Sequence, residues 1–152
     1  MSDIVTASHV FTDCTASSID EVLSFFSQKA VDLGYAEDAN AVFEAFRARE
    51  AEGTTGMTGG FAIPHAKTAA VKEAVVLVAK LSGDVEWPSM DDAPIKCAIA
   101  LLIPAGEAGT THLRLLSKIA VMLMDAHKRE ELLAENDAEK LAGLVLAGIS
   151  AE

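Results

Sequence analysis

The residue with the clearest chemical potential in this sequence is His65, which closes the run Gly59-Gly60-Phe61-Ala62-Ile63-Pro64-His65. The two glycines allow unusual backbone angles and a close approach, and the apolar residues after them predict a short strand. Pro64 has no N–H to donate and should end that strand, which places His65 at a strand end on a stiffened backbone. Imidazole titrates near neutral pH, so His65 could act as a general base, a metal ligand or a covalent nucleophile.

Each of these chemistries needs partners, and the sequence restricts which partners are available. A metal site would need further ligands near His65, and His112 is the one candidate, because His9 and His127 lie in unpromising contexts. The signatures HExxH, GxSxG and GxxxxGK[ST] are missing from the sequence, which disfavours a zinc protease, a serine hydrolase and a P-loop protein. We therefore expect no metal and no cofactor, and an ordinary structural histidine remains an alternative for His65.

Phosphoryl transfer asks less of the protein, because it needs an in-line nucleophile surrounded by positive charge and hydrogen-bond donors. Arg49 follows Val42 and Phe46 at the helical spacing i, i+4, i+7, so an arginine shares a face with core residues. Its head group either meets an anion or reaches out to solvent while its stem packs. The loop 54–56 and a helix N-terminus near His112 could supply further donors.

Two parts of the chain resemble a known family. The run from Arg49-Glu50 through Gly53-Thr54-Thr55-Gly56 to Ala62-Ile63-Pro64-His65-Ala66 resembles the active-site region of enzyme IIA. This is the fructose/mannitol family of the bacterial sugar phosphotransferase system, with its nitrogen-regulatory branch. The segment from His112 to Ala120 resembles the second histidine segment of that family, and Leu101 to Ala105 resembles the strand before it.

The resemblance covers about residues 18–149 and implies one enzyme IIA type 2 domain over residues 1–152. It implies that His65 takes a phosphoryl group, through Nε2, from an HPr-type phosphocarrier and passes it to a cysteine of the IIB domain of a sugar permease. Arg49 and His112 match the residues around the phosphoryl group. Further candidates for phosphate or partner binding are Thr54, Thr55, Gly60 and Lys67.

Three functional alternatives stay open at this point. The chain could be a carrier for sugar or polyol uptake, or a nitrogen-regulatory protein whose phosphorylation state controls protein binding. It could also be a binding domain that kept the fold without being phosphorylated, although intact Arg49, His65 and His112 disfavour this. One departure from the family pattern is the sequence Gly59-Gly60-Phe61, where the family usually has Asn-Gly-Ile.

Composition narrows the possible partners and the compartment. The chain has 152 residues, 51% of them hydrophobic, and a formal net charge of −11, so its surface should repel nucleic acid and attract a basic protein face. No apolar stretch approaches the roughly 18 residues of a membrane span, so we expect a protein that is not embedded in a membrane. Cys14 and Cys97 are predicted to be reduced thiols in a cytoplasmic protein.

The elements that must hold these residues are predicted from periodicity and capping signals. Residues 1–17 should be irregular or weakly extended. Helix caps are expected at four places: Ser18 with Glu21, Asp38, Thr110 or Thr111, and Asn136 with Glu139. A short helix is expected over 129–135. In the helix after residue 110 the expected core stripe is Leu113, Leu116, Ile119, Ala120 and Leu123.

Two apolar runs predict central strands, Ala74 to Leu81 and Cys97 to Ile103, with Val85 and Trp87 in an edge strand. Helices between and around these strands predict an α/β or α+β fold, and the family resemblance implies a mixed central sheet flanked by helices on both sides.

Overall fold

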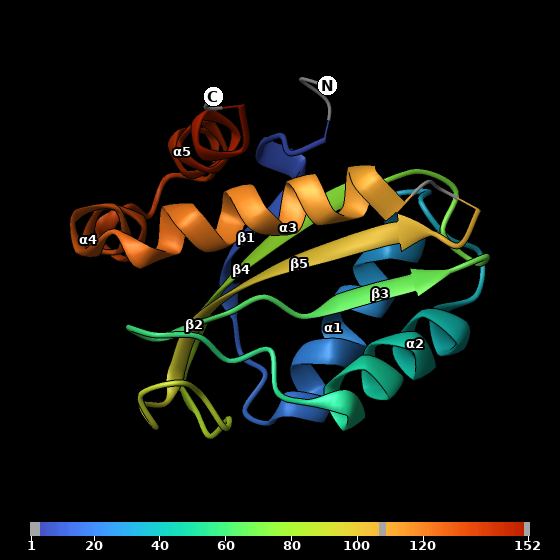
Figure 1. Cartoon of the computed structure of the whole chain (residues 1–152), viewed down its shortest axis with the longest axis horizontal. Helices are drawn as coiled ribbons and strands as arrows, with labels where there is room; N and C mark the ends of the chain where they lie inside the picture. Colours follow the sequence, from blue (N-terminus) through green and yellow to red (C-terminus); the bar gives the residue numbers. More distant parts are fainter. Residues whose placement is uncertain (1–3, 107–108, 151–152) are drawn as a thin grey trace.

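A computed structural model describes residues 4–106 and 109–150, with side chains described outside 109–112. Within these ranges a mixed sheet is covered by helices on both faces (Figure 1). The elements are, in order, η1 (Ala7–His9), β1 (Val10–Cys14), α1 (Ile19–Asp32), α2 (Ala39–Glu52), β2 (Phe61–Ala62), β3 (His65–Thr68), β4 (Val75–Val85), β5 (Ile95–Pro104), α3 (Gly109–Met124), α4 (Ala126–Ala134) and α5 (Ala138–Ser150).

The sheet is built around the antiparallel pair β4 and β5, which are the two longest strands. Strand β1 adds to β4 in parallel, while β2 and β3 both add to β5 in parallel, so that the order is β1-β4-β5-β2 with β3 also on β5. Helices α1 and α2 lie on one face, and α3, α4 and α5 lie on the other (Figure 1). The predicted fold class, a mixed sheet flanked on both sides, is confirmed.

The apolar runs of β4 and β5 feed two separate cores because successive residues of a strand point to opposite faces of the sheet. One core joins the sheet to α3, α4 and α5 through residues such as Leu101, Ile103 and Ile119. The other joins it to α1 and α2 through residues such as Leu102 and Phe46. A continuous apolar run is therefore what a central strand between two helical layers requires.

The helix signals near the site are largely confirmed. The Ser18 hydroxyl accepts from the Glu21 N–H, and Asp38 accepts from the Ala41 N–H, so both begin helices as predicted. Gly34 and Gly53 follow the ends of α1 and α2 with positive φ angles of 86° and 152°. The Glu21 carboxylate does not complete the capping box on Ser18, because it accepts from Ser17 instead.

The strand predictions need three corrections. Residues 1–17 are not wholly irregular or weak, because Val10–Cys14 forms the parallel edge strand β1. Strand β4 does not end at Leu81 but continues through exposed polar residues to Val85, so that Val85 belongs to the same strand and Trp87 lies in the loop that follows. No helix separates the two central strands, which are joined directly and run antiparallel.

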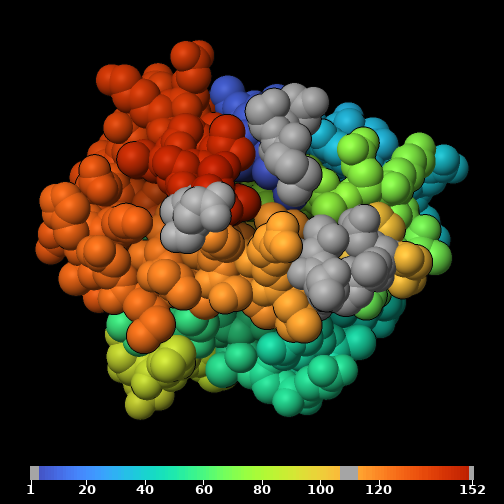
Figure 2. Space-filling model, turned by 45° about the horizontal axis from the view of Figure 1, so that its top comes forward, coloured from blue at the N-terminus to red at the C-terminus, as the bar shows by residue number. Residues whose placement is uncertain are grey.

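The helices after the sheet also differ in detail. The core side of α3 carries Leu115, Ile119, Met122 and Leu123, whereas Leu113 is 63% exposed, so the predicted stripe was wrong at Leu113. Thr110 and Thr111 lie inside α3 rather than before it. The outer face of α3, shown in orange between α5 and α2 in Figure 2, is accessible.

The last two helices have aspartate caps that the sequence reading did not assign. Asp125 accepts from the N–H groups of His127 and Lys128, so α4 begins at Ala126 rather than at Arg129. Asp137, not Asn136, accepts from the Lys140 N–H at the start of α5.

A buried lysine fastens α4 to the sheet. The Nζ of Lys80, on β4, donates to the main-chain carbonyls of Leu132, Leu133 and Glu135 at 3.1, 2.8 and 2.8 Å. Lys80 is only 8% exposed, and an ammonium group supplies three donors. The positive charge also lies at the negative end of the α4 dipole, which is favourable. Lys80 thus satisfies carbonyls that the helix end leaves unpaired.

Replacing Lys80 with methionine keeps the apolar stem and removes the donors. We expect Lys80→Met to lower the free energy of unfolding by about 2–3 kcal/mol, because charge-assisted bonds are lost and buried carbonyls are left unpaired. The control is Lys72→Met, which removes an exposed ion pair with Glu37 and should cost less than about 1 kcal/mol. Urea unfolding measures both variants, and equal effects would contradict this role for Lys80.

Burial also sets the reactivity of the cysteines, both of which are free. Burial raises the pKa of the Cys97 thiol from 9.0 to about 12, although Lys80 opposes the shift. At pH 8 the folded protein therefore holds less thiolate at Cys97 than the unfolded chain does. We expect Ellman's reagent to modify Cys97 in urea and to leave it largely unmodified in the native protein. Between pH 9.0 and about 12 the unfolded chain gives up this proton first, so this thiol should lower stability as pH rises. Rapid native modification would contradict the assignment.

Candidate functional site

His65 lies where an edge of the sheet is interrupted. Strand β2 pairs Phe61 with Cys97, and β3 pairs His65 with Leu101, so the register along β5 is the same on both sides of the break. Pro64 lies between the two strands, and its carbonyl accepts from the Leu101 N–H at 2.9 Å. The first strand ends at Ala62, one residue earlier than predicted, and His65 begins a second strand rather than lying at the end of the first.

The strand pairing determines the direction of the His65 side chain. Directly paired residues point to the same face of a sheet, and His65 is paired with Leu101, which belongs to the core under α3. His65 therefore points to the face that α3 covers. Its side chain is largely buried, with a residue exposure of 7%.

The ring of His65 has a defined tautomer. Nδ1 lies 2.5 Å from the main-chain carbonyl oxygen of Ile63. A carbonyl oxygen can only accept a hydrogen bond, so Nδ1 carries the proton. In the neutral ring the lone pair is then on Nε2. The backbone break at Pro64 thus fixes which nitrogen can act as a nucleophile.

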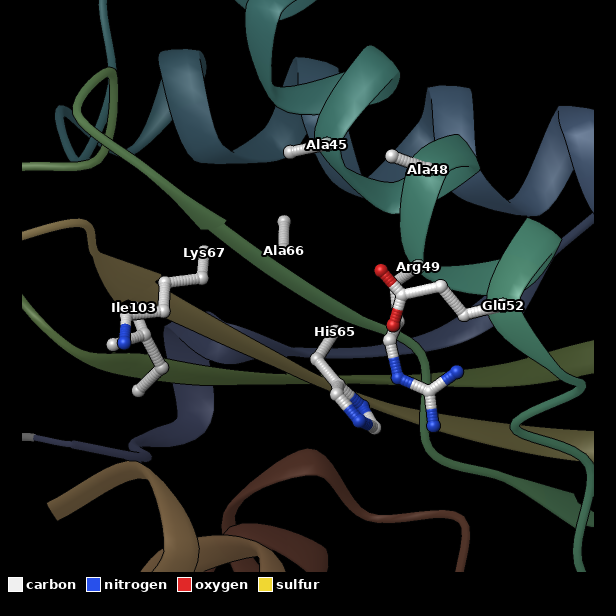
Figure 3. Close-up of a pocket in the computed structure, with 8 residues that line it drawn as sticks. All are labelled: Ala45, Ala48, Arg49, Glu52, His65, Ala66, Lys67 and Ile103. Atoms are coloured by element: carbon white, nitrogen blue, oxygen red, sulfur yellow. The ribbon is translucent and has the colours of Figure 1, made fainter. Parts of the chain in front are cut away.

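A pocket of about 300 Å³ opens beside this ring, between α2 and the edge strand β3. Figure 3 shows the guanidinium of Arg49 next to the imidazole of His65, while the Lys67 side chain lies farther along β3 beside Ile103. Lys67 and Ile103 are paired across the strands, which explains their contact. Among the residues whose side chains are described, the pocket is lined by Ala45, Ala48, Arg49, Glu52, His65, Ala66, Lys67 and Ile103.

Arg49 is half-buried and is oriented by the end of its own helix. Its Nη1 donates to the Gly53 carbonyl at 2.7 Å, which places a cation at the C-terminal end of α2. A guanidinium has five N–H donors, so this bond leaves others to meet an anion. Arg49 belongs to a pocket-facing line with Ala45, Ala48 and Glu52, beside the core line of Val42 and Phe46.

The loop before the histidine motif is held by the protein itself. The Thr54 hydroxyl donates to the Pro88 carbonyl, and the Thr55 hydroxyl donates to the Glu50 carboxylate. Gly60 has φ = 90°, and its carbonyl accepts from the N–H groups of Lys96 and Cys97. The structure therefore brings Arg49 and Lys67 into the His65 pocket and does not bring Thr54, Thr55 or Gly60 into it.

His112 lies in the first turn of α3, as predicted, but its side chain falls outside the described residues. Helix α3 begins beyond the carboxyl end of β5, on the face to which His65 points.

Sequence reasoning missed two carboxylates of α2. Glu52 lines the pocket and adds a negative charge near Arg49 (Figure 3). Glu52 follows Arg49 by three residues, and this helical spacing was a usable signal. Glu50 accepts from the Thr55 N–H and from the indole N–H of Trp87, both at 3.3 Å. The spacing of Glu50 in the sequence could not predict these contacts, because Thr55 lies in the loop after α2 and Trp87 lies in the loop after β4.

The side chain of Arg129, on α4, fills the space beside Gly59. Gly59 has φ = 74°, and a Cβ there would lie 2.3 Å from Nε of Arg129 on α4. Arg129 also donates to the Leu123 carbonyl at the end of α3. The Gly59 N–H donates to Asp91 at 3.0 Å, and this bond is the main reason that the pKa of Asp91 is lowered. Glycine at position 59 thus allows α4 to pack against the loop.

The described part of the chain offers neither a metal site nor a membrane-spanning helix. Among these residues, no three His, Cys, Asp or Glu side chains lie together in a way that would hold a metal ion. None of the helices there has the length and apolar character that a membrane span requires.

Comparison with known proteins agrees with this geometry. The sequence model of the family "Phosphoenolpyruvate-dependent sugar phosphotransferase system, EIIA 2" matches residues 3–146. The fructose-specific EIIA component of Haloferax volcanii is 38% identical over 84% of this chain and 81% of its own length. A nitrogen regulatory protein of Bradyrhizobium diazoefficiens is 33% identical over 93% of this chain and 91% of its own.

The structural similarity is equally extensive. The crystal structure of the nitrogen regulatory protein IIA-Ntr from Neisseria meningitidis superimposes with a TM-score of 0.86 at 28% identity, covering 95% of this chain and 97% of that one. The chain therefore belongs to the EIIA type 2 family of the phosphotransferase system, which supports a general role in phosphoryl transfer.

Proposed function

We propose that this protein is a phosphocarrier whose His65 is transiently phosphorylated on Nε2. The observation that supports this most strongly is the hydrogen bond from Nδ1 to the Ile63 carbonyl, which leaves the lone pair on Nε2 beside the Arg49 pocket. A neutral nitrogen nucleophile with a nearby fixed cation meets the requirements of phosphoryl transfer, which depends on positioning and charge stabilisation.

The transfer is a substitution at phosphorus. His65 Nε2 forms the new P–N bond while the P–N bond of the donor phosphohistidine breaks, and its electron pair returns to the donor ring. The His65 ring becomes a cation that keeps its Nδ1 proton, and the Ile63 carbonyl stabilises that charge. In the next step a cysteine thiolate of an acceptor attacks phosphorus, and the electron pair of the P–N bond returns to Nε2.

The charges around His65 have distinct roles in this proposal. Arg49 offsets the charge of the equatorial phosphoryl oxygens, and His112 donates a hydrogen bond to them. Lys67 lies farther along β3 and meets the partner or the outer side of the phosphate. Thr54, Thr55 and Gly60 support the motif through the loop contacts described above and do not bind phosphate directly.

The partners follow from the family. We propose an HPr-type phosphocarrier as donor and the IIB domain of a sugar permease as acceptor, in the cytoplasm, with uptake and phosphorylation of a sugar or polyol as the outcome. The net charge of −11 favours a basic donor face and disfavours nucleic acid. Similarity to the fructose-specific component of Haloferax volcanii supports this version.

A nitrogen-regulatory role is the second candidate. It is supported by the two nitrogen regulatory proteins, one similar over nine-tenths of both sequences and the other with a TM-score of 0.86. In that role the phosphorylation state of His65 controls binding to another protein. Purified IIB proteins distinguish the two roles, because a IIB acceptor is expected to remove the phosphoryl group from a transport carrier and to leave a regulator phosphorylated.

The test of the phosphocarrier role is labelling from radioactive phosphoenolpyruvate through enzyme I and HPr. Wild type should acquire one phosphate that is labile in acid and stable in base, and His65→Ala should acquire none. His127→Ala is the control, because His127 lies exposed on α4, and its labelling should equal that of wild type. Label on the His65→Ala variant would contradict the assignment of His65 as the phosphorylated residue, and so would the lack of label on wild type.

Arg49 should affect the rate of labelling rather than the site. We expect Arg49→Ala to slow transfer by about 100-fold, because one preorganised charge at the phosphoryl oxygens is lost. Arg49→Lys should recover only part of that rate, since an ammonium lacks the planar fork of donors. The matched control is Arg47→Ala, which removes an exposed arginine of the same helix that pairs with Asp20. Rapid-quench kinetics measure all three, and equal rates for Arg49→Ala and Arg47→Ala would contradict the role.

A further inference from the structure

A continuous series of hydrogen bonds leads from Glu50 to the ring of His65. The Glu50 carboxylate accepts from both the N–H and the hydroxyl of Thr55. The Thr55 carbonyl accepts from the Ile63 N–H at 3.0 Å, and the Ile63 carbonyl accepts from His65 Nδ1. Each group in the series is held by the one before it, although Glu50 itself does not line the pocket.

The middle of this series is a short stretch of pairing outside the main sheet. Met57 donates to the Phe61 carbonyl at 2.7 Å, and Gly56 forms an antiparallel bridge with Ala62. Together with the Thr55–Ile63 bond, these contacts hold the loop along the free side of β2. The position of the Ile63 carbonyl therefore depends on where the loop is held, and Glu50 holds its first part.

Glu50 is suited to this task by its chemistry. A carboxylate accepts hydrogen bonds and donates none, and all three groups directed at Glu50 are donors: the Thr55 N–H, the Thr55 hydroxyl and the Trp87 indole N–H. Thr55 and Trp87 are buried at 5% and 4% exposure, so water replaces the lost acceptor poorly. A glutamine at position 50 would replace one of the two accepting oxygens with an NH₂ group, which would then face another donor instead of accepting its hydrogen bond.

We propose that Glu50 is a positioning residue for His65. By holding Thr55 and, through it, the Ile63 carbonyl, Glu50 keeps the proton on Nδ1 and the nucleophilic lone pair on Nε2. This inference rests on the proposed phosphocarrier function for its kinetic consequence, but its effect on the tautomer does not require phosphorylation. Glu50 is not a catalytic residue, because it contacts neither the phosphoryl group nor the reacting nitrogen.

The experiment compares Glu50→Gln with Glu44→Gln. Both remove one carboxylate from α2, but Glu44 is exposed and lies outside the hydrogen-bond series and the pocket. Proton–nitrogen correlation spectra of ¹⁵N-histidine protein report which ring nitrogen of His65 carries the proton. Wild type and Glu44→Gln should show protonated Nδ1 alone, whereas Glu50→Gln should show a mixture of both tautomers.

The kinetic readout separates positioning from general stability. We expect Glu50→Gln to lower the maximal labelling rate by about 10-fold, a typical effect of small misplacement of a reacting group. The donor concentration at half-maximal rate should stay unchanged, because Glu50 contacts no donor. A variant that is less stable but keeps the wild-type tautomer and maximal rate would show that Glu50 only supports the loop, and the proposal would be wrong.

A second variant keeps the test valid if Glu50→Gln does not fold. Thr55→Val preserves the backbone N–H and carbonyl and removes the hydroxyl donor, so it should shift the tautomer in the same direction by a smaller amount. An unchanged tautomer in Thr55→Val would then overturn the proposal. If wild type takes no phosphate from HPr but these variants still shift the tautomer, the phosphocarrier function fails while the positioning role stands.

Discussion

The hydrogen bond between His65 Nδ1 and the Ile63 carbonyl is the constraint on which the site depends. It exists because Pro64 cannot donate to the ladder and separates two short strands that otherwise share one register on β5. The interruption turns a backbone carbonyl toward a side chain two residues later. A rigid sheet thereby sets the protonation pattern of one imidazole, which is what a nitrogen nucleophile needs at neutral pH.

The rest of the fold places charge around that imidazole. The central pair β4 and β5 anchors the parallel edge strand β3, and α2 packs against β3 so that Arg49 reaches the pocket. Helix α3 covers the opposite face, where His65 points. Both helical layers rest on apolar faces of the same two strands, so the site lies at the sheet edge where the two layers meet. Lys80 of β4 binds the C-terminal end of α4, and Arg129 of α4 packs against Gly59. Both contacts hold α4 on this framework.

Local signals predicted much of this arrangement. Ser18 and Asp38 act through contacts within a few residues, so their roles as helix caps were visible in the sequence. The strand Val10–Cys14 was missed because only its two ends are buried, which leaves no alternating pattern. Strand β4 was predicted too short because three exposed residues, Ser82, Gly83 and Asp84, interrupt its apolar run before Val85.

Contacts between residues far apart in the sequence were harder to predict, both at the candidate site and in the packing of α3. Arg49 and His65 could be named as candidates from type and spacing, whereas the contacts of Glu50 depend on a loop that returns to it and on Trp87 from beyond β4. Thr54 and Thr55 were named as candidates for phosphate or partner binding because small hydroxyls suit that task. In the fold their hydroxyls donate to the Pro88 carbonyl and the Glu50 carboxylate, contacts that the sequence did not predict. In α3, the predicted stripe began at Leu113, whereas packing on the sheet buries Leu115 and leaves Leu113 exposed.

The most direct measurement is to locate the phosphoryl group in the phosphorylated protein by ³¹P and ¹⁵N NMR with labelled histidine. Coupling between phosphorus and the ring nitrogens identifies both the residue and the nitrogen. The account predicts a single phosphorylated site, Nε2 of His65, with Nδ1 still protonated. A phosphoryl group on Nδ1 of His65, or on another histidine such as His112, would contradict it.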